Sequence, residues 1–277
     1  AEARRGLAPL LIRALDDASP RVSAAAARAI YDLNLGAPEP FTPLAADASG
    51  PPPVDATGPE APSAFRALAR SLASLPARRG HVIEPIVRRA IEANLRLGDT
   101  DPDAADRLVA FAAAASVPPS WRILALERVE AWAGGDRRER VWGHWIPRPA
   151  RSTGPVEAAL ARHEPALLAS SAGDAELRFR VDRLRARLLL TMSAAEVATV
   201  LADERRDPRF RAVLLEEAAR RFPEAAGRLV TAALAVRTEA ADVLRMAAMD
   251  VLAAGDRDPV RRVEVAAAAI EDGTVRE

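Results

Sequence analysis

A period of about 34 residues recurs along most of the chain, and this period constrains the fold more than any other feature. Each copy starts with an apolar residue followed by arginine and has further apolar residues four and eight positions on. Four copies and two weaker ones begin at Val87, Trp121, Phe210, Leu244, Val22 and Leu177. Self-similarity at a period of about 20 to 50 residues marks stacked supersecondary units. The chain is therefore predicted to be built from repeats.

Two of the five intervals between copies are longer than the period. Three intervals measure 33 or 34 residues, whereas the other two exceed 34 by 31 and 22 residues. Each long interval contains a segment without a helical pattern, at residues 36–62 and 134–155. We interpret these segments as insertions in a regular array.

Each repeat is expected to hold two helices. Apolar residues spaced by four lie on one face of a helix, so each marked segment predicts an amphipathic helix with a buried stripe. Alanine, leucine and arginine, which dominate the composition, are strong helix formers. A second apolar segment at helical spacing follows between the marked ones, at residues 102–115, 156–170, 194–204, 224–236 and 259–270. The predicted fold class is all-α, an α-solenoid of HEAT/armadillo-like helical repeats, as one domain over residues 1–277.

Capping residues followed by proline mark several helix starts, because proline lacks the N–H that would be unsatisfied there. These pairs are Ser19-Pro20, Asp101-Pro102, Asp207-Pro208 and Asp258-Pro259. Gly98 and Gly255 mark helix ends.

The runs at residues 17–29 and 207–211 resemble the HEAT-repeat consensus. Tetratricopeptide repeats share the length but carry a tryptophan, glycine and tyrosine pattern, and this chain has a single tyrosine, Tyr31. In HEAT repeats the arginine after the apolar residue tends to form a ladder with a nearby aspartate. The resemblance therefore implies a structural role for Arg88, Arg122, Arg178, Arg211 and Arg245.

Three further runs, at residues 26–33, 88–98 and 140–149, resemble the HEAT-repeat region of large planctomycete multidomain proteins. In those proteins a sugar-dehydrogenase-like β-propeller precedes the repeats and a haem-binding cytochrome c domain follows them. This resemblance implies a linker scaffold in a larger redox protein and an extracytoplasmic location. It transfers no catalytic residue to this chain.

The composition excludes several kinds of chemistry. The chain has no cysteine, which excludes disulfides, thiolate metal sites and c-type haem attachment within it. Its 39 basic residues, all arginine, balance 39 acidic ones, so nucleic acid is disfavoured as a partner. The longest run without a charged side chain, residues 108–121, is too short to cross a bilayer, and no membrane insertion is expected.

No catalytic residue, metal site or cofactor is predicted. His81, His144 and His163 fall in different repeats without metal-ligand spacing. No Walker loop, dinucleotide fingerprint, nucleophile elbow or paired-carboxylate motif occurs. Acidic residues alternate with arginine, as at residues 127–130 and 216–221, which is typical of solvated helix faces.

The Pro/Gly-rich insertion at residues 45–62 is expected to be an exposed flexible loop, because it lacks apolar side chains to bury.

The insertion at residues 134–155 is rich in tryptophan and arginine, the residue types enriched at interface hot spots. We expect it to be ordered, with its tryptophans packed against the repeats and its arginines, including Arg151, pointing outward. The alternative is that exposed tryptophans make it a binding site. The candidate partner-binding residues are Arg138, Arg140, Trp142, His144, Trp145 and Arg148.

A second basic stretch lies on the predicted helix at residues 175–190, with arginines at 178, 180, 183, 185 and 187. It could meet an acidic partner or phosphates. The favoured interpretation is that these arginines pair with acids of their own and neighbouring repeats.

The leading functional hypothesis is a non-catalytic scaffold, monomeric, that binds another protein or flanking domains of its own polypeptide. The alternative is a HEAT-like DNA glycosylase or another nucleic-acid-binding solenoid, and a chromophore lyase with similar repeats is a third class. Against a glycosylase, Trp121 and Trp132 occupy core-type helix positions.

The ends of the sequence also carry an expectation. The helix predicted at residues 7–16 corresponds to the second helix of a repeat, and residues 275–276 lie close to where the next repeat should start. We therefore expect a piece cut from a longer solenoid, truncated at both ends, with apolar faces exposed at each end.

Overall fold

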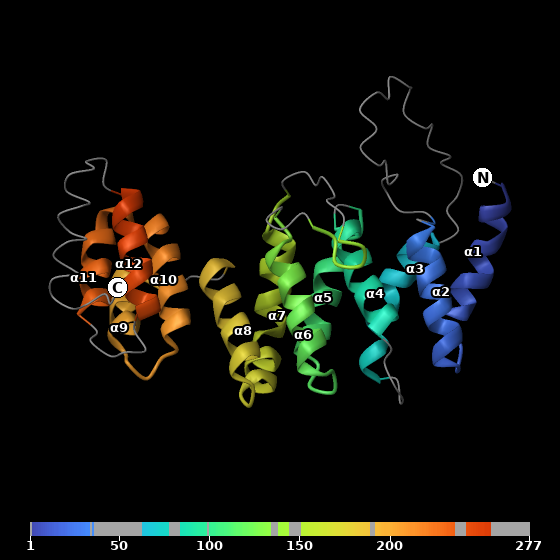
Figure 1. The fold of residues 1–277 in the computed structure, drawn as a ribbon, viewed down its shortest axis with the longest axis horizontal. Coiled ribbons are helices and arrows are strands. Elements are labelled where there is room, and N and C mark those ends of the chain that lie inside the picture. The colour runs from blue at the N-terminus through green and yellow to red at the C-terminus, as the bar shows by residue number, and fades with distance from the viewer. Residues whose placement is uncertain are drawn as a thin grey trace, which may run out of the picture. The chain divides into compact units, whose positions relative to one another are not determined.

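A computed structural model of the chain describes residues 2–33, 35, 63–77, 84–98, 100–133, 138–143, 151–188, 192–235 and 242–255. Within these residues the structure has twelve α-helices, two 3-10 helices and no strand (Figure 1). The prediction of an all-α protein is confirmed. The insertion at 45–62 and the helix expected at 259–270 lie outside the described residues. The chain divides into two compact units, residues 1–173 and residues 174–277.

The first unit packs its helices in two rows. One row runs α1, α3, α5 and α7, and the other runs α2, α4 and α6, with each helix touching the next in its row. The two rows also touch within the successive pairs α1–α2, α3–α4 and α5–α6. The bounds are α1 Glu2–Ala14, α2 Pro20–Asp32, α3 Ala64–Ser71, η1 Leu75–Ala77, α4 Glu84–Leu97, α5 Ala104–Ala113, α6 Pro119–Glu130 and α7 Gly154–Ser171.

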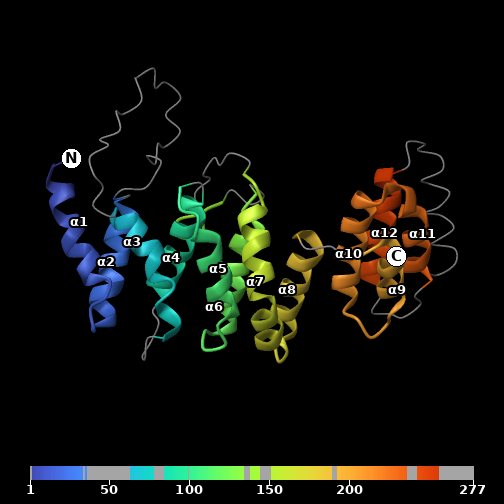
Figure 2. The same cartoon turned by 180° about the vertical axis from the view of Figure 1, so that it is seen from behind.

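The second unit repeats this arrangement. Helices α8, α10 and α12 touch in succession, α9 touches α11, and α10 and α12 also pack against their preceding helices (Figure 2). The bounds are α8 Ala175–Leu188, α9 Ala194–Ala202, α10 Pro208–Arg221, η2 Pro223–Ala225, α11 Ala226–Leu234 and α12 Asp242–Gly255.

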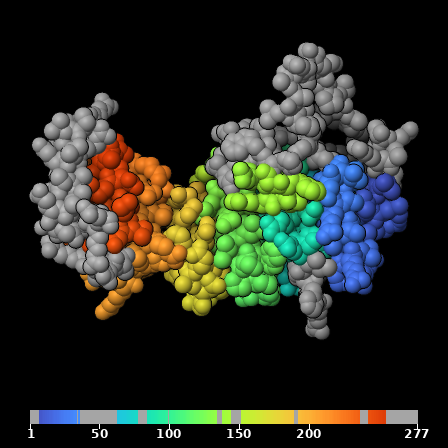
Figure 3. Space-filling view, viewed as in Figure 1, coloured from blue at the N-terminus to red at the C-terminus, as the bar shows by residue number. Residues whose placement is uncertain are grey.

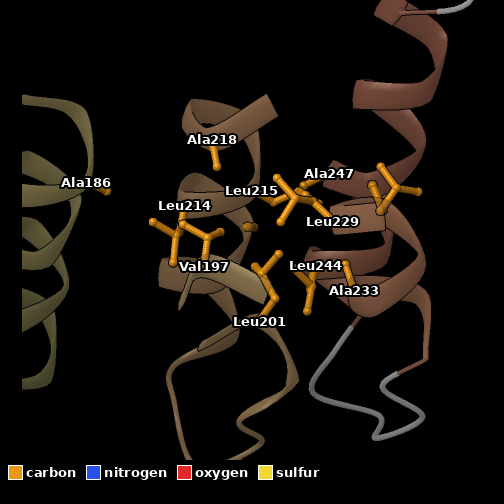
Figure 4. Close-up of a cluster of buried hydrophobic side chains, with 13 residues drawn as sticks. Ala186, Val197, Leu201, Leu214, Leu215, Ala218, Leu229, Ala233, Leu244 and Ala247 are labelled. Carbon is orange, nitrogen blue, oxygen red and sulfur yellow. The ribbon is translucent and has the colours of Figure 1, made fainter. Parts of the chain in front are cut away.

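The apolar stripe predicted for the marked helices forms much of the core, although Val22, its first residue in α2, is 42% exposed. In α4, Val87, Ile91 and Leu95 are completely buried. In the second unit, Leu214 of α10 and Leu244 of α12 meet side chains of α9 and α11 in one cluster (Figure 4). Burying a leucine of this kind contributes about 1.5–3 kcal/mol relative to leaving it exposed.

A buried arginine joins successive helices at the same place in both units. Arg122 is the fourth residue of α6, and its Nε donates to the carbonyl oxygen of Ala112 at 2.6 Å. Arg211 is the fourth residue of α10, and its Nη1 donates to the carbonyl oxygen of Leu201 at 3.1 Å. Each acceptor lies ten positions earlier, in the last turn of the preceding helix. Carbonyls there lack an intrahelical partner and carry partial negative charge, so a guanidinium suits them.

Arg122 also reaches a third helix. Its Nη1 donates to the carbonyl oxygen of Ser170 at 3.0 Å, and its Nη2 donates to the Ser170 hydroxyl, at the end of α7. One guanidinium therefore joins the C-terminal ends of α5 and α7 to α6.

Arg122 and Arg211 differ from the expectation in their acceptors, whereas Arg178 and Arg245 pair with a nearby aspartate. Arg122 and Arg211 bond main-chain carbonyls where an aspartate was expected, because the helix ends beside them already supply unsatisfied acceptors. Arg245 is buried and pairs with Asp242 of its own helix. Arg88 and Arg178 are partly exposed and pair with Glu84 and Asp182, each four positions away on the same helix.

Two details of the helices were not anticipated. The eight-residue helix α3 was not predicted, although Ser63 caps it by accepting from the Arg66 N–H. Helix α5 begins at Ala104 and not at Pro102. The Asp101 carboxylate accepts from the Asp103 N–H at 3.2 Å and from Arg107 at 2.7 Å, which keeps Pro102 in the preceding turn.

Apolar side chains are exposed on α1, where Leu7 is 45% and Leu10 is 53% accessible. The helix expected at the other end lies outside the described residues, so truncation of a longer solenoid stays a prediction. None of the helices in the described part of the chain combines the length and the apolar character that crossing a bilayer requires.

Replacing Arg122 by methionine tests the helix junction. Methionine keeps much of the buried volume but leaves the carbonyls of Ala112 and Ser170 without this donor. We expect the free energy of unfolding to fall by about 2–4 kcal/mol. Urea denaturation measures this loss. The matched control is Arg28→Met on the exposed face of α2, with an expected change within about 0.5 kcal/mol. Equal stability of the two variants would refute the junction's role.

Candidate functional site

The segment at residues 138–143 folds around a buried carboxylate of its own. Glu139 is 1% exposed. Its Oε1 accepts from the Val141 N–H at 2.5 Å, and its Oε2 accepts from the Trp142 N–H at 2.6 Å. The hydroxyl of Tyr31, on α2, also donates to Oε1 at 2.8 Å. These bonds turn the acid inward and fix the backbone of the segment.

Two further charged side chains hold the peptide groups beside Glu139. Glu92 of α4 accepts from the Arg140 N–H at 3.2 Å. Arg128 of α6 donates to the carbonyl oxygen of Arg138 at 3.2 Å and lies 3.6 Å from the Glu92 carboxylate. Glu92 and Arg128 are almost completely buried. The segment is thus bonded to α2, α4 and α6, and in Figure 3 it crosses α4 at the surface, lime green over teal.

Tyr31 is held in its neutral form. Burial raises the pKa of its phenol well above the usual value, and the carboxylates of Glu92 and Glu139 raise it further, against a smaller lowering by Arg96. The Arg96 guanidinium lies 5.7 Å from the Tyr31 ring centroid, and Phe65 stacks on the ring at 5.6 Å. A neutral phenol can donate to Glu139 throughout the ordinary pH range.

The outer face of the segment is basic and aromatic, in contrast to the acid Glu139 on its inner face. Arg138 and Arg140 are exposed, and Trp142 is 52% exposed. The Arg89 guanidinium lies 5.8 Å from the Trp142 ring centroid and is bonded to Asp32 at 3.1 Å. Arg88 donates to the carbonyl oxygen of Arg140 at 3.3 Å. The backbone under the exposed indole is therefore fixed from several sides.

The prediction that Trp142 packs down on the repeats is wrong, since half of its side chain remains exposed. Buried Glu139 anchors this part of the insertion, so the indole is not needed for that purpose. Of the other candidate partner-binding residues, His144, Trp145 and Arg148 lie outside the described residues.

Arg151 does not point outward as expected. Its Nη1 donates to the carbonyl oxygen of Leu95 at 2.8 Å, and its guanidinium lies 5.1 Å from the ring centroid of Trp132. The Trp132 indole is buried and donates to the carbonyl oxygen of Ser152 at 3.1 Å. A Cβ on Gly98 would lie 2.7 Å from this indole, so glycine permits the close approach. The insertion is thus anchored at its end by partly buried Arg151, which bonds α4 and lies against Trp132.

Four arginines on α8, at positions 178, 180, 185 and 187, pair with carboxylates. Arg178 and Arg185 bond Asp182, and Arg187 lies 3.3 Å from Glu217 of α10. Arg180 bonds Glu176, which also accepts from Arg209; together these bonds lower the pKa of Glu176, against a smaller effect of burial. This pairing agrees with the interpretation favoured for the stretch.

Among the described residues, no group of histidine and carboxylate side chains is arranged to hold a metal ion. His163 bonds the Asp106 carboxylate at 3.0 Å. No known protein family, curated protein or solved structure matches the chain. The site is therefore interpreted from its own geometry: an inward acid that fixes an outward tryptophan and two arginines.

The substitution Glu139→Gln should release the segment. One side of the amide donates where the carboxylate accepts, so the N–H groups of Val141 and Trp142 cannot both keep their partner. We expect at least one of these two amides to exchange about tenfold faster, the equivalent of one lost hydrogen bond. Hydrogen exchange followed by NMR measures the rates. Glu224→Gln, at an exposed carboxylate of η2 in the second unit, is the control and should leave both rates unchanged. Unchanged rates in Glu139→Gln would contradict the anchoring role.

The raised pKa of Tyr31 predicts that the protein loses stability at alkaline pH. Its folded pKa lies above that of the unfolded chain, which is about 10. The contribution of neutral Tyr31 to the free energy of unfolding is complete below the unfolded pKa and disappears as the pH rises through the folded pKa. Because Tyr31 is the only tyrosine, tyrosinate absorbance follows its titration directly. Ionisation near the unfolded pKa in the folded protein, or an unchanged alkaline loss in Tyr31→Phe, would contradict this account.

Proposed function

We propose that the chain is a non-catalytic scaffold, a HEAT-like α-solenoid that presents a fixed surface to another protein or to flanking domains of its own polypeptide. The observation that carries the proposal is the exposed indole of Trp142 on a backbone fixed by buried Glu139. Tryptophan and arginine are the residue types that most often supply binding energy in protein interfaces.

The helix packing supports a scaffold. In each unit, successive helices of a row touch, and buried Arg122 and Arg211 join helices at equivalent positions. Repeats that contact chiefly their neighbours form extended surfaces, which repeat proteins use for binding. The planctomycete resemblance agrees with such a role between domains of a larger protein.

The use of the buried charges supports a binding role over catalysis. Glu139 and Glu92 accept main-chain N–H groups, and Asp101 accepts from Arg107. A general acid or base needs a position from which it can exchange a proton with a substrate. These carboxylates are instead committed to holding helices and segments in place.

A DNA glycosylase is the weaker alternative. Such an enzyme needs one continuous positive surface with aromatic side chains, whereas the chain has no net charge and Trp132 is buried beneath Arg151. No described feature favours this activity over binding.

A selection from a random-peptide display library on the immobilised chain tests the proposal, with base release from alkylated duplex DNA assayed in parallel. The scaffold predicts selected peptides that compete with one another for the chain, because they use a common surface. It also predicts no base release. Recovery of no specific peptide, or catalytic base release, would overturn the proposal.

A further inference from the structure

We propose that the outer face of residues 138–142 docks an acidic segment of a partner protein. Carboxylates of the partner would pair with Arg138 and Arg140, and an apolar side chain would cover Trp142. This inference rests on the proposed scaffold function and names the kind of partner that the scaffold takes.

The acidic and basic side chains of the segment lie on opposite faces. Its one acid, Glu139, is 1% exposed and points inward to Tyr31 and main-chain N–H groups. Its two arginines are exposed. The surface offered to a partner therefore has a positive and aromatic character that the local sequence, with acid and bases interleaved, does not reveal. An acidic segment complements it.

The surface is organised before a partner arrives. Glu139 fixes the amide of Trp142, Glu92 fixes the amide of Arg140, and Arg128 fixes the carbonyl of Arg138. Binding then costs less free energy, because this backbone is already ordered. The cost of ordering an interface is a main reason why affinity does not follow directly from the area buried. The indole contacts Arg89 with one part only, and fuller burial would stabilise the protein further, so its exposed half is open to a partner.

The surroundings favour a short acidic peptide over nucleic acid. Acidic side chains flank the face: Glu84 is largely exposed beside Arg88, and Asp32 is partly exposed beside Arg89. A phosphate backbone commonly engages about six to ten basic side chains and would meet these acids along its path. A peptide needs to place only a few carboxylates and one apolar group.

Two changes test the surface, each with a matched control in the second unit. Trp142→Ala removes the apolar contact, and its control is Met246→Ala, an exposed apolar side chain of α12. Arg138→Glu combined with Arg140→Glu reverses the charge, and its control is Arg228→Glu, an exposed arginine of α11. Because Trp142 also contacts Arg89, the urea midpoint of each variant first establishes that it is folded under the binding conditions.

The measurement is fluorescence anisotropy of labelled synthetic copies of peptides selected on the full chain. We expect peptides rich in aspartate and glutamate with an apolar residue. Trp142→Ala and the double charge reversal should each weaken binding by about tenfold or more, while the controls should bind like the original protein. Copies with Asn and Gln in place of the acids should lose binding, and added salt should weaken it.

Four results would overturn the docking proposal without overturning the scaffold function. Selected peptides without acidic enrichment, or acidic peptides insensitive to both changes, would place binding elsewhere on the scaffold. Trp142-dependent binding of single-stranded oligothymidylate in preference to the peptides would make the ligand nucleic acid. Trp142-dependent self-association in sedimentation would make it a second copy. Recovery of no peptide at all would instead overturn the scaffold function itself.

Discussion

A guanidinium buried against the end of the preceding helix is the interaction on which the helix packing depends. Burying a charge is costly unless hydrogen bonds and opposite charge compensate for the lost water. The C-terminal turn of a helix offers both, as free carbonyls with partial negative charge. Arg122 and Arg211 use this property at equivalent positions of the two units. The apolar stripes bring the helices together, and the two arginines set where α6 meets α5 and where α10 meets α9.

The row α2–α4–α6 in turn determines the surface that the protein presents. Tyr31, Glu92 and Arg128 come one from each of these helices and converge on the segment around Glu139. Because the acid is taken into this network, Arg138, Arg140 and Trp142 are left outside. The exposed surface around Trp142 thus follows from the way α2, α4 and α6 align their polar side chains.

The sequence predicted the helices that carry a buried apolar stripe. All six marked segments are helical, because apolar residues four apart have to be buried on one side. Helix α3 was missed because it is short and follows a proline-rich stretch, although Phe65-Arg66 with Ala69 and Ala73 fits the apolar-arginine mark. Its signals were Ser63 as a cap and the spacing of Phe65, Leu68 and Leu72.

The candidate site was located by composition, but its orientation could not be predicted. The charge run at residues 136–140 has the pattern of a solvated loop, and nothing local distinguishes Glu139 from its neighbours. Its burial depends on Tyr31, which lies 108 positions away in the sequence. With that contact unknown, tryptophan was the better choice for the buried anchor, and the prediction for Trp142 failed for this reason.

NMR of the arginine side chains tests the central interaction most directly. The Nε–H of Arg122, which donates to the Ala112 carbonyl, should exchange with water far more slowly than that of exposed Arg28. The Arg122→Met variant assigns the signal. Slow exchange of the Arg122 proton is the predicted result. Exchange of Arg122 as fast as that of Arg28 would show that the guanidinium is not held at the helix end and would contradict the account.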